Sequence, residues 1–132
     1  MNAQATYSPD TGGMIYVVDD DDAVRDGVSL LLRAFGWPVE SFPSASDFLA
    51  RYVPRDGQCL VLDLHMPGMH GAQLEEHLRD QGDEIPVIIV TAYREDPLLT
   101  RARAAGASRV LSKPFNDMEL IENIEEALAS RR

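Results

Sequence analysis

From residue 14 to its end, the sequence alternates between short apolar runs and longer segments with helical periodicity. This alternation constrains the fold more than any other feature, because strands separated by helices form parallel pairs. We predict strands at 14–18, 38–42, 59–64, 86–92 and 108–115, and helices at 23–36, 44–52, 72–80, 97–106 and 116–130.

The number of repeated units selects the fold class. Five βα units in 132 residues are too few for a closed barrel, which needs eight. They favour an open, doubly wound (βα)5 sheet of the flavodoxin-like type, with five parallel strands in the order 2-1-3-4-5. We therefore predict one domain over 14–130. Residues 1–13 lack the basic flank and apolar stretch of a signal peptide, and we interpret them as a flexible tail.

Residues typical of helix ends support these boundaries. Asp21 and Asp22 are expected to cap and charge the first turn of the first helix. Asp96 followed by Pro97 is typical of the start of the fourth. The remaining signals are the capping-box pairs Ser44 with Asp47 and Asn116 with Glu119, and the terminating glycines Gly36 and Gly106.

Composition narrows the functional classes. With a net charge of −10, from 22 acidic and 12 basic residues, the chain should repel phosphate backbones, so we do not expect direct nucleic acid binding. No apolar run approaches the roughly 18 residues of a membrane span. Cys59 is the only cysteine, which excludes an internal disulfide and suits a reducing cytoplasm. Its place within an expected strand predicts a buried, inert thiol.

Polar residues stand where the predicted strands end. Asp19 and Asp20 follow the first strand, Asp63 lies at the end of the third, and Thr91 lies at the end of the fourth. Lys113, the only lysine in the chain, follows the fifth. Because parallel strands end at one edge of a sheet, these side chains should converge there.

Three carboxylates at close quarters repel one another unless a cation lies among them. Oxygen ligands with free coordination positions favour Mg²⁺, which often shares its coordination sphere with phosphate. A lysine and a hydroxyl opposite could neutralise a phosphoryl group, and an aspartate could accept that group covalently. A purely structural alternative is that Asp19 and Asp20 only cap a helix, but Asp21 and Asp22 lie closer to the helix start.

Four motifs carry a family resemblance: "VVDD" (17–20), "DLHMPGMHG" (63–71), "VTA" (90–92) and "SKPF" (112–115). Together they resemble the receiver domain of two-component response regulators, over about Met14 to Ala129. The stretches "VVDDDDAVR" and "SASDFLA" are most similar to receivers of the FixJ type. The resemblance implies a cytoplasmic signalling switch rather than an enzyme, whose chemistry is limited to its own phosphorylation and dephosphorylation.

The resemblance also implies a role for each matched residue. Asp63 would accept a phosphoryl group from a sensor histidine kinase or a phosphotransfer protein. Asp19, Asp20, Asp63 and the backbone carbonyl of His65 would hold Mg²⁺. Thr91 and Lys113 would contact the phosphoryl oxygens, and the Lys113-Pro114 bond would be cis.

The implied output is a change in the surface formed by the fourth helix, the fifth strand and the last helix, used for homodimerisation or partner docking. We expect Pro97, Leu98 and Leu99 to form an apolar patch on that surface.

The family usually has an aromatic residue three positions before the lysine, where this chain has Val110. Tyr93 and His65 occupy the variable positions beside the site, and their bulk predicts slow attack by water on the phosphoryl group.

Two alternatives stay open. A degenerate receiver would serve as an interaction module without phosphorylation, and Val110 is the residue that favours this interpretation. An aspartate-nucleophile phosphatase would carry a second acid two residues after Asp63, where this chain has His65. His65, His70 and His77 share no metal-ligand spacing, so we expect them to be surface or capping residues.

Overall fold

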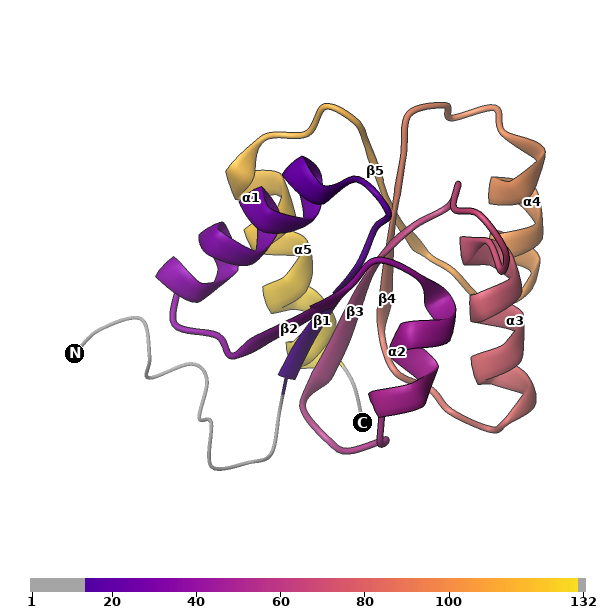
Figure 1. Cartoon of the computed structure of the whole chain (residues 1–132), viewed down its shortest axis with the longest axis horizontal. Helices are drawn as coiled ribbons and strands as arrows, with labels where there is room; N and C mark the ends of the chain where they lie inside the picture. The colour runs from indigo at the N-terminus through magenta and orange to yellow at the C-terminus, as the bar shows by residue number, and fades with distance from the viewer. Residues whose placement is uncertain (1–13, 131–132) are drawn as a thin grey trace.

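The computed structural model describes residues 14–130, which form a parallel sheet between two layers of helices (Figure 1). The predicted flexible tail, 1–13, lies outside the described residues. The strands are β1 (Met14–Val18), β2 (Val39–Phe42), β3 (Gln58–Asp63), β4 (Val87–Thr91) and β5 (Arg109–Ser112). The helices are α1 (Asp22–Ala34), α2 (Ala45–Arg51), α3 (Gly71–Asp80), α4 (Pro97–Ala104) and α5 (Asp117–Ser130).

The strand order is β2-β1-β3-β4-β5, and all four pairings are parallel, which confirms the predicted fold class. β1 and β3 are neighbours, with Val18 opposite Leu62. β4 pairs with β5, with Thr91 opposite Ser112. The chain therefore brings the ends of four of its strands next to one another along one edge.

Alternate residues of the central strands β1, β3 and β4 point into two separate cores, which is why these three strands are largely apolar. Ile15 and Val17 of β1 pack in the core under α1 and α5, whereas Tyr16 and Val18 pack in the core under α2, α3 and α4. Figure 1 shows the same division, with α1 and α5 on one face of the sheet and the other three helices opposite. Cys59 is fully buried, as predicted, and burial raises the pKa of its thiol to about 12.

The helix ends follow the predicted signals. Asp21 caps α1 by accepting from the amides of Ala23 and Val24, and Asp96 caps α4 by accepting from the amide of Leu98. Both glycine stops have positive φ, 99° at Gly36 and 120° at Gly106, and helix termination uses this conformation. The box of Asn116 and Glu119 is reciprocal, Ser44 accepts from the amide of Asp47, and His70 caps α3 in a capping box with Gln73.

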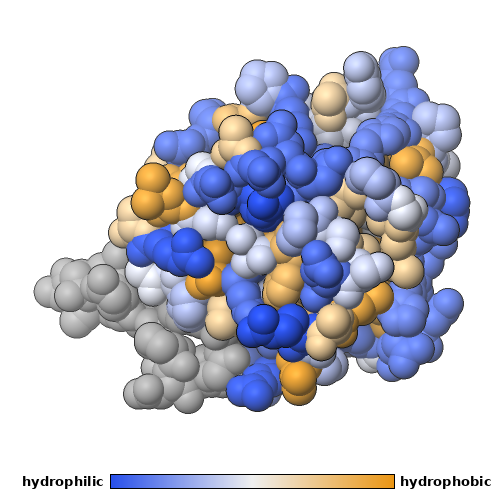
Figure 2. Space-filling view, viewed as in Figure 1, coloured by the Kyte–Doolittle hydropathy of each residue, from blue (hydrophilic) through white to orange (hydrophobic). Residues whose placement is uncertain are grey.

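The prediction of an apolar patch at 97–99 is wrong. Leu99 is buried and Leu98 is half-buried against the core, so only Pro97 of the three is exposed. Leu99 and Ala102 are the buried residues that attach α4 to the core, and Leu98 packs beside them. Figure 2 shows a face of the molecule that is mostly hydrophilic, with hydrophobic residues in small, separate groups. No helix in the described range has the length and apolar character needed to cross a bilayer.

Two glycines offer a matched test of this packing. A Cβ on Gly71, at the start of α3, would lie 2.4 Å from the carbonyl oxygen of Asp63, whereas a Cβ on Gly27, within α1, would have no neighbour within 4 Å. We expect Gly71→Ala to lower the free energy of unfolding by about 1–3 kcal/mol through this clash. Gly27→Ala should raise it by about 0.5–1 kcal/mol, because alanine loses less entropy in a helix. Urea denaturation of both variants checks the pair, and equal effects would contradict it.

Candidate functional site

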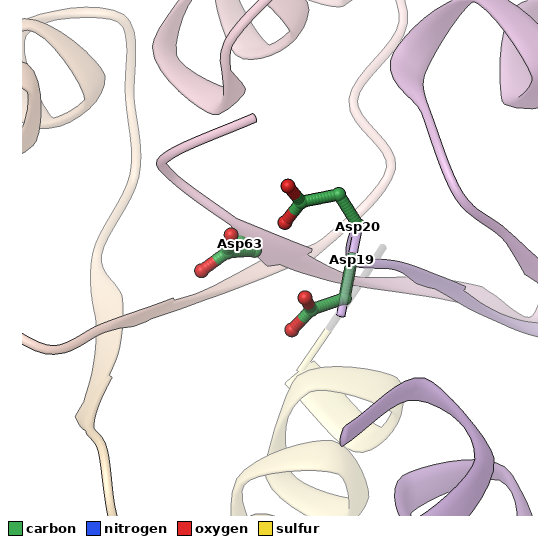
Figure 3. A group of neighbouring side chains, drawn as sticks. All are labelled: Asp19, Asp20 and Asp63. Carbon is green, nitrogen blue, oxygen red and sulfur yellow. The ribbon is translucent and has the colours of Figure 1, made fainter. Parts of the chain in front are cut away.

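Three carboxylates meet where β1 and β3 end. Asp19 and Asp20 follow the last residue of β1, and Asp63 is the last residue of the neighbouring strand β3. Figure 3 shows the three side chains projecting to the same side of the strand ends. Each residue offers a carboxylate oxygen that lies within 4.8 Å of those offered by the other two. Asp19 and Asp63 are buried, whereas Asp20 is exposed, so the group could hold a metal ion that is open to solvent on one side.

Lys113 links two of these carboxylates from the end of β5. Its Nζ lies 3.0 Å from Asp63 Oδ1 and 3.2 Å from Asp19 Oδ2. The bond that follows it, Lys113-Pro114, is cis, which confirms that prediction. The lysine amide donates to the carbonyl of Thr91 at 2.8 Å, so the start of the β5–α5 connection is anchored on β4. The lysine predicted from the sequence therefore lies among the predicted aspartates.

Asp63 does not ionise like an ordinary aspartate. Burial and the negative charge of Asp19 raise its pKa to about 6, although the hydrogen bond and charge of Lys113 act in the opposite direction. Burial alone would lower the pKa of Lys113, but its contacts with Asp63 and Asp19 reverse this and raise it. The site thus holds a carboxylate that lacks enough positive charge around it at neutral pH. A cation among the three aspartates would supply that charge, so the donor set fits a hard divalent ion.

Thr91 reaches the same edge but its hydroxyl faces its own loop. Its Oγ1 accepts from the amide of Tyr93 at 3.2 Å and donates to the carbonyl of Tyr93 at 3.3 Å. In this conformation the hydroxyl serves the loop between β4 and α4. A contact with a group on Asp63 would require the hydroxyl to leave Tyr93.

His65 and Tyr93, which were predicted to lie beside the site, are on the loops that follow β3 and β4. The Tyr93 side chain is exposed, and the ring of His65 contacts the carboxylate of Asp96 through Nε2. The idea that both shield a phosphoryl group from water stays a prediction. His70 is a helix cap, as expected for a histidine without a metal-ligand spacing. Within 14–130, Asp19, Asp20 and Asp63 form the only group of three or more side chains suited to a metal.

Sequence reasoning missed two residues that shape the site. Arg25 of α1 donates from Nη1 to the carbonyl of Asp19 at 2.8 Å and from Nη2 to Asp22 Oδ1 at 2.5 Å. It therefore holds the loop that carries the aspartates. Gly71 packs so closely against the backbone of Asp63 that a side chain at this position would clash with the Asp63 carbonyl oxygen. The glycine lay inside a quoted motif without an assigned role, and nothing in the local pattern marks the arginine.

Comparison with known families identifies this arrangement. The family model described as "Response regulator receiver domain" matches residues 15–125, which covers most of the chain. The chain belongs to the response regulator receiver family. Receivers of this family are signalling domains. The resemblance inferred from the four motifs is therefore confirmed, and so is its FixJ-type character.

Among curated proteins, the receiver is 39% identical over 122 residues to the response regulator protein TodT of Pseudomonas putida, covering 92% of this chain and 54% of TodT. It is also 39% identical over 114 residues to the transcriptional regulatory protein FixJ of Azorhizobium caulinodans, covering 86% of this chain and 54% of FixJ. The receiver thus spans about half the length of the curated relatives it matches.

Solved structures give the same result. The response regulator StyR aligns with a TM-score of 0.82 and 44% identity, over 89% of this chain and 59% of the StyR chain. The FixJ-N structure aligns with the same TM-score and 35% identity, over 90% of this chain and 95% of that one. The alignment covers nearly all of both chains, so FixJ-N and this receiver are similar in size as well as in fold.

The raised pKa of Asp63 predicts how stability depends on pH without metal. The folded receiver keeps a proton on Asp63 up to about pH 6, whereas the unfolded chain loses it near its ordinary pKa of about 4. Folding therefore takes up a proton in this window, and the contribution of Asp63 to stability falls as pH rises through it. Between pH 5 and 7.5 in EDTA, the wild type should lose on the order of 1 kcal/mol relative to Asp63→Asn. Denaturation at both pH values checks this, and parallel pH profiles for the two proteins would contradict it.

Proposed function

We propose that this receiver is a phosphorylation-dependent switch of a two-component system, with Asp63 as the phosphoacceptor. The observation that carries the proposal is the placement of Asp63, which is buried at a strand end between Asp19 and Lys113. Burial and the negative charge of Asp19 raise its pKa, and a bound cation would oppose both effects. Such a carboxylate is oriented by its neighbours and open to a phosphoryl donor on the side where Asp20 is exposed.

The chemistry follows from these contacts. An oxygen of Asp63 attacks the phosphorus of a phosphohistidine, the new P–O bond forms, and the P–N bond to the histidine breaks. Lys113, now paired with Asp63 at 3.0 Å, donates to a phosphoryl oxygen as negative charge develops there. Thr91 can donate to a second oxygen once its hydroxyl leaves the carbonyl of Tyr93.

The carboxylates also suit the cation that receivers use. Asp19, Asp20 and Asp63, with the backbone carbonyl of His65, would hold Mg²⁺, and the bound ion would supply positive charge next to the phosphoryl oxygens. Arg25 supports this role by fixing the backbone of Asp19. Asp21 remains outside it, because its carboxylate caps α1.

The partner is a sensor histidine kinase or a phosphotransfer protein in the cytoplasm. The output surface is formed by α4, β5 and α5, where Arg109 of β5 pairs with Glu126 of α5 at 2.9 Å. α4 presents the exposed Arg103, and α5 presents the exposed Glu122 and Glu125. Charges of opposite sign on one face favour self-association in an antiparallel arrangement. The receiver itself, with a net charge of −10, is not expected to bind nucleic acid.

The degenerate-receiver alternative rests on Val110. This residue is half-buried against the core beneath α4, and it has no ring that could rotate on phosphorylation. An interaction module would keep the acidic site but never use it. The two interpretations differ in one measurable property, which is whether Asp63 becomes phosphorylated.

Incubation with acetyl phosphate and Mg²⁺ should add one phosphoryl group to the wild-type receiver. Asp63→Asn should stay unmodified because an amide oxygen is a poor nucleophile, and Lys113→Ala should be modified more slowly because the developing charge loses its donor. Intact mass spectrometry with a time course measures both. Asp26→Asn, which removes an exposed carboxylate on α1, is the control and should be modified like the wild type. An unmodified wild type would favour the interaction module.

Beryllofluoride, which imitates the phosphoryl group, should increase self-association through the α4-β5-α5 surface. Reversal of one charge, in Arg103→Glu, should oppose this because both faces of a two-fold contact then carry like charge. Sedimentation velocity with and without beryllofluoride measures the mass. Arg33→Glu on α1, away from this surface, is the matched control. If the mass does not change when beryllofluoride is added, self-association is not the output, and the surface binds a different partner.

A further inference from the structure

The loop between β4 and α4 is closed by hydrogen bonds that begin at Thr91 and end at Asp96. The hydroxyl of Thr91 bonds to both the amide and the carbonyl of Tyr93. The same carbonyl accepts from the amide of Asp96 at 3.4 Å. If the hydroxyl of Thr91 leaves this network, the carbonyl that holds the backbone of Asp96 loses its other donor. A change at Thr91 is therefore transmitted to the first residue before α4.

The side chain of Asp96 joins α4 to the loop after β3. Its Oδ1 accepts from the amide of Leu98 at 2.8 Å and caps the helix, while its Oδ2 contacts Nε2 of His65. Asp96 is 8% exposed, so its carboxylate is shielded from water, whereas the His65 ring that contacts it is exposed. Burial opposes ionisation of this carboxyl, but the Leu98 amide and the His65 ring outweigh it and lower its pKa. Asp96 is thus a buried anion, with one carboxylate oxygen bonded to the first turn of α4 and the other in contact with His65 on the loop after β3.

His65 lies two residues after Asp63, on the segment that leaves the acidic site. A phosphoryl group on Asp63 would place new negative charge beside this segment and would compete with Asp96 for the ring. The same group would recruit the hydroxyl of Thr91. Both effects act on Asp96, one through its side chain and one through its backbone.

The α3–α4 contact beyond this point includes no residue of the acidic site. Arg101 of α4 bonds to Glu76 of α3 at 2.6 Å and lies 3.4 Å from His70. These contacts tie the two helices together without a group that touches the carboxylates of the site. They supply a control for any effect that comes only from loosening α4.

We propose that Asp96 is a positioning residue that couples Asp63 to α4 in this receiver. Through His65 it holds the first turn of α4 in the unphosphorylated position, and activation requires the release of this contact. This coupling does not need a rotating aromatic ring, which Val110 cannot provide. The inference rests on the proposed phosphorylation of Asp63, and it assigns a function to a residue that the fold requires only as a cap.

The test removes the His65 contact and keeps the cap. In Asp96→Ser, the hydroxyl can still accept from the helix amides, but a shorter side chain with one oxygen cannot also reach the ring. Removing a contact that favours the inactive conformation should tighten beryllofluoride binding about fivefold at saturating Mg²⁺. Calorimetric titration measures the affinity, and the melting temperature of the apoprotein is recorded separately. A purely structural role would lower the melting temperature without tightening the binding.

Two further variants make the result specific. Arg101→Gln should bind beryllofluoride like the wild type, because it loosens α4 only at the contact with α3. In a His65→Ala background, adding Asp96→Ser should change the affinity no further, because the ring is already gone. If Asp96→Ser does not fold, Asp96→Asn, which preserves the shape and removes the charge, takes its place and should give a smaller gain.

The outcomes separate this inference from the proposed function. Unchanged or weaker beryllofluoride binding by the Asp96 variant, with normal binding by the wild type, overturns the coupling and leaves the phosphoacceptor role intact. A tightening of equal size in Arg101→Gln also overturns it. A wild type that binds no beryllofluoride contradicts the proposed function, and the inference fails with it.

Discussion

Repulsion between the carboxylates of Asp19 and Asp63 is the interaction on which the rest of the site depends. Two strands of a buried sheet fix these residues as neighbours, so they cannot separate to relieve the repulsion. Lys113 offsets part of it, yet burial and the charge of Asp19 still raise the pKa of Asp63 to about 6. The excess of negative charge makes the site receptive to a cation and sensitive to any further charge on Asp63. Burial of Asp63 next to Asp19 therefore costs stability at this edge of the sheet at neutral pH.

The two cores explain how the sheet tolerates this strain. β1, β3 and β4 are covered on both faces, so the strand ends keep their positions when the charge at the edge changes. The loops that follow those strands lack this support and depend on polar contacts such as those of Arg25 with Asp19 and Thr91 with Tyr93. A change at the edge must therefore appear in the loops and in the helices that they start.

Much of this arrangement could be predicted from the sequence because it depends on periodicity and on strand ends. The alternating pattern determines the parallel sheet, and a parallel sheet forces Asp63 and Lys113 to one edge wherever the helices lie. The direction of a side chain is a different matter. The hydroxyl of Thr91, the ring of His65 and the inward turn of Leu99 depend on loop conformation and helix rotation, which a local pattern does not determine.

Helix α4 is held to the core by fewer buried residues than its neighbour α3. It has eight residues and buries only Leu99 and Ala102, whereas α3 has ten residues and buries five. Less apolar area holds it to the sheet, so polar contacts at its first turn determine a larger share of its position. The Asp96 carboxylate supplies two of these contacts, to Leu98 and His65, and its backbone depends on the loop that Thr91 closes. Weak attachment to the core and polar contacts directed toward the acidic edge support the output role proposed for α4.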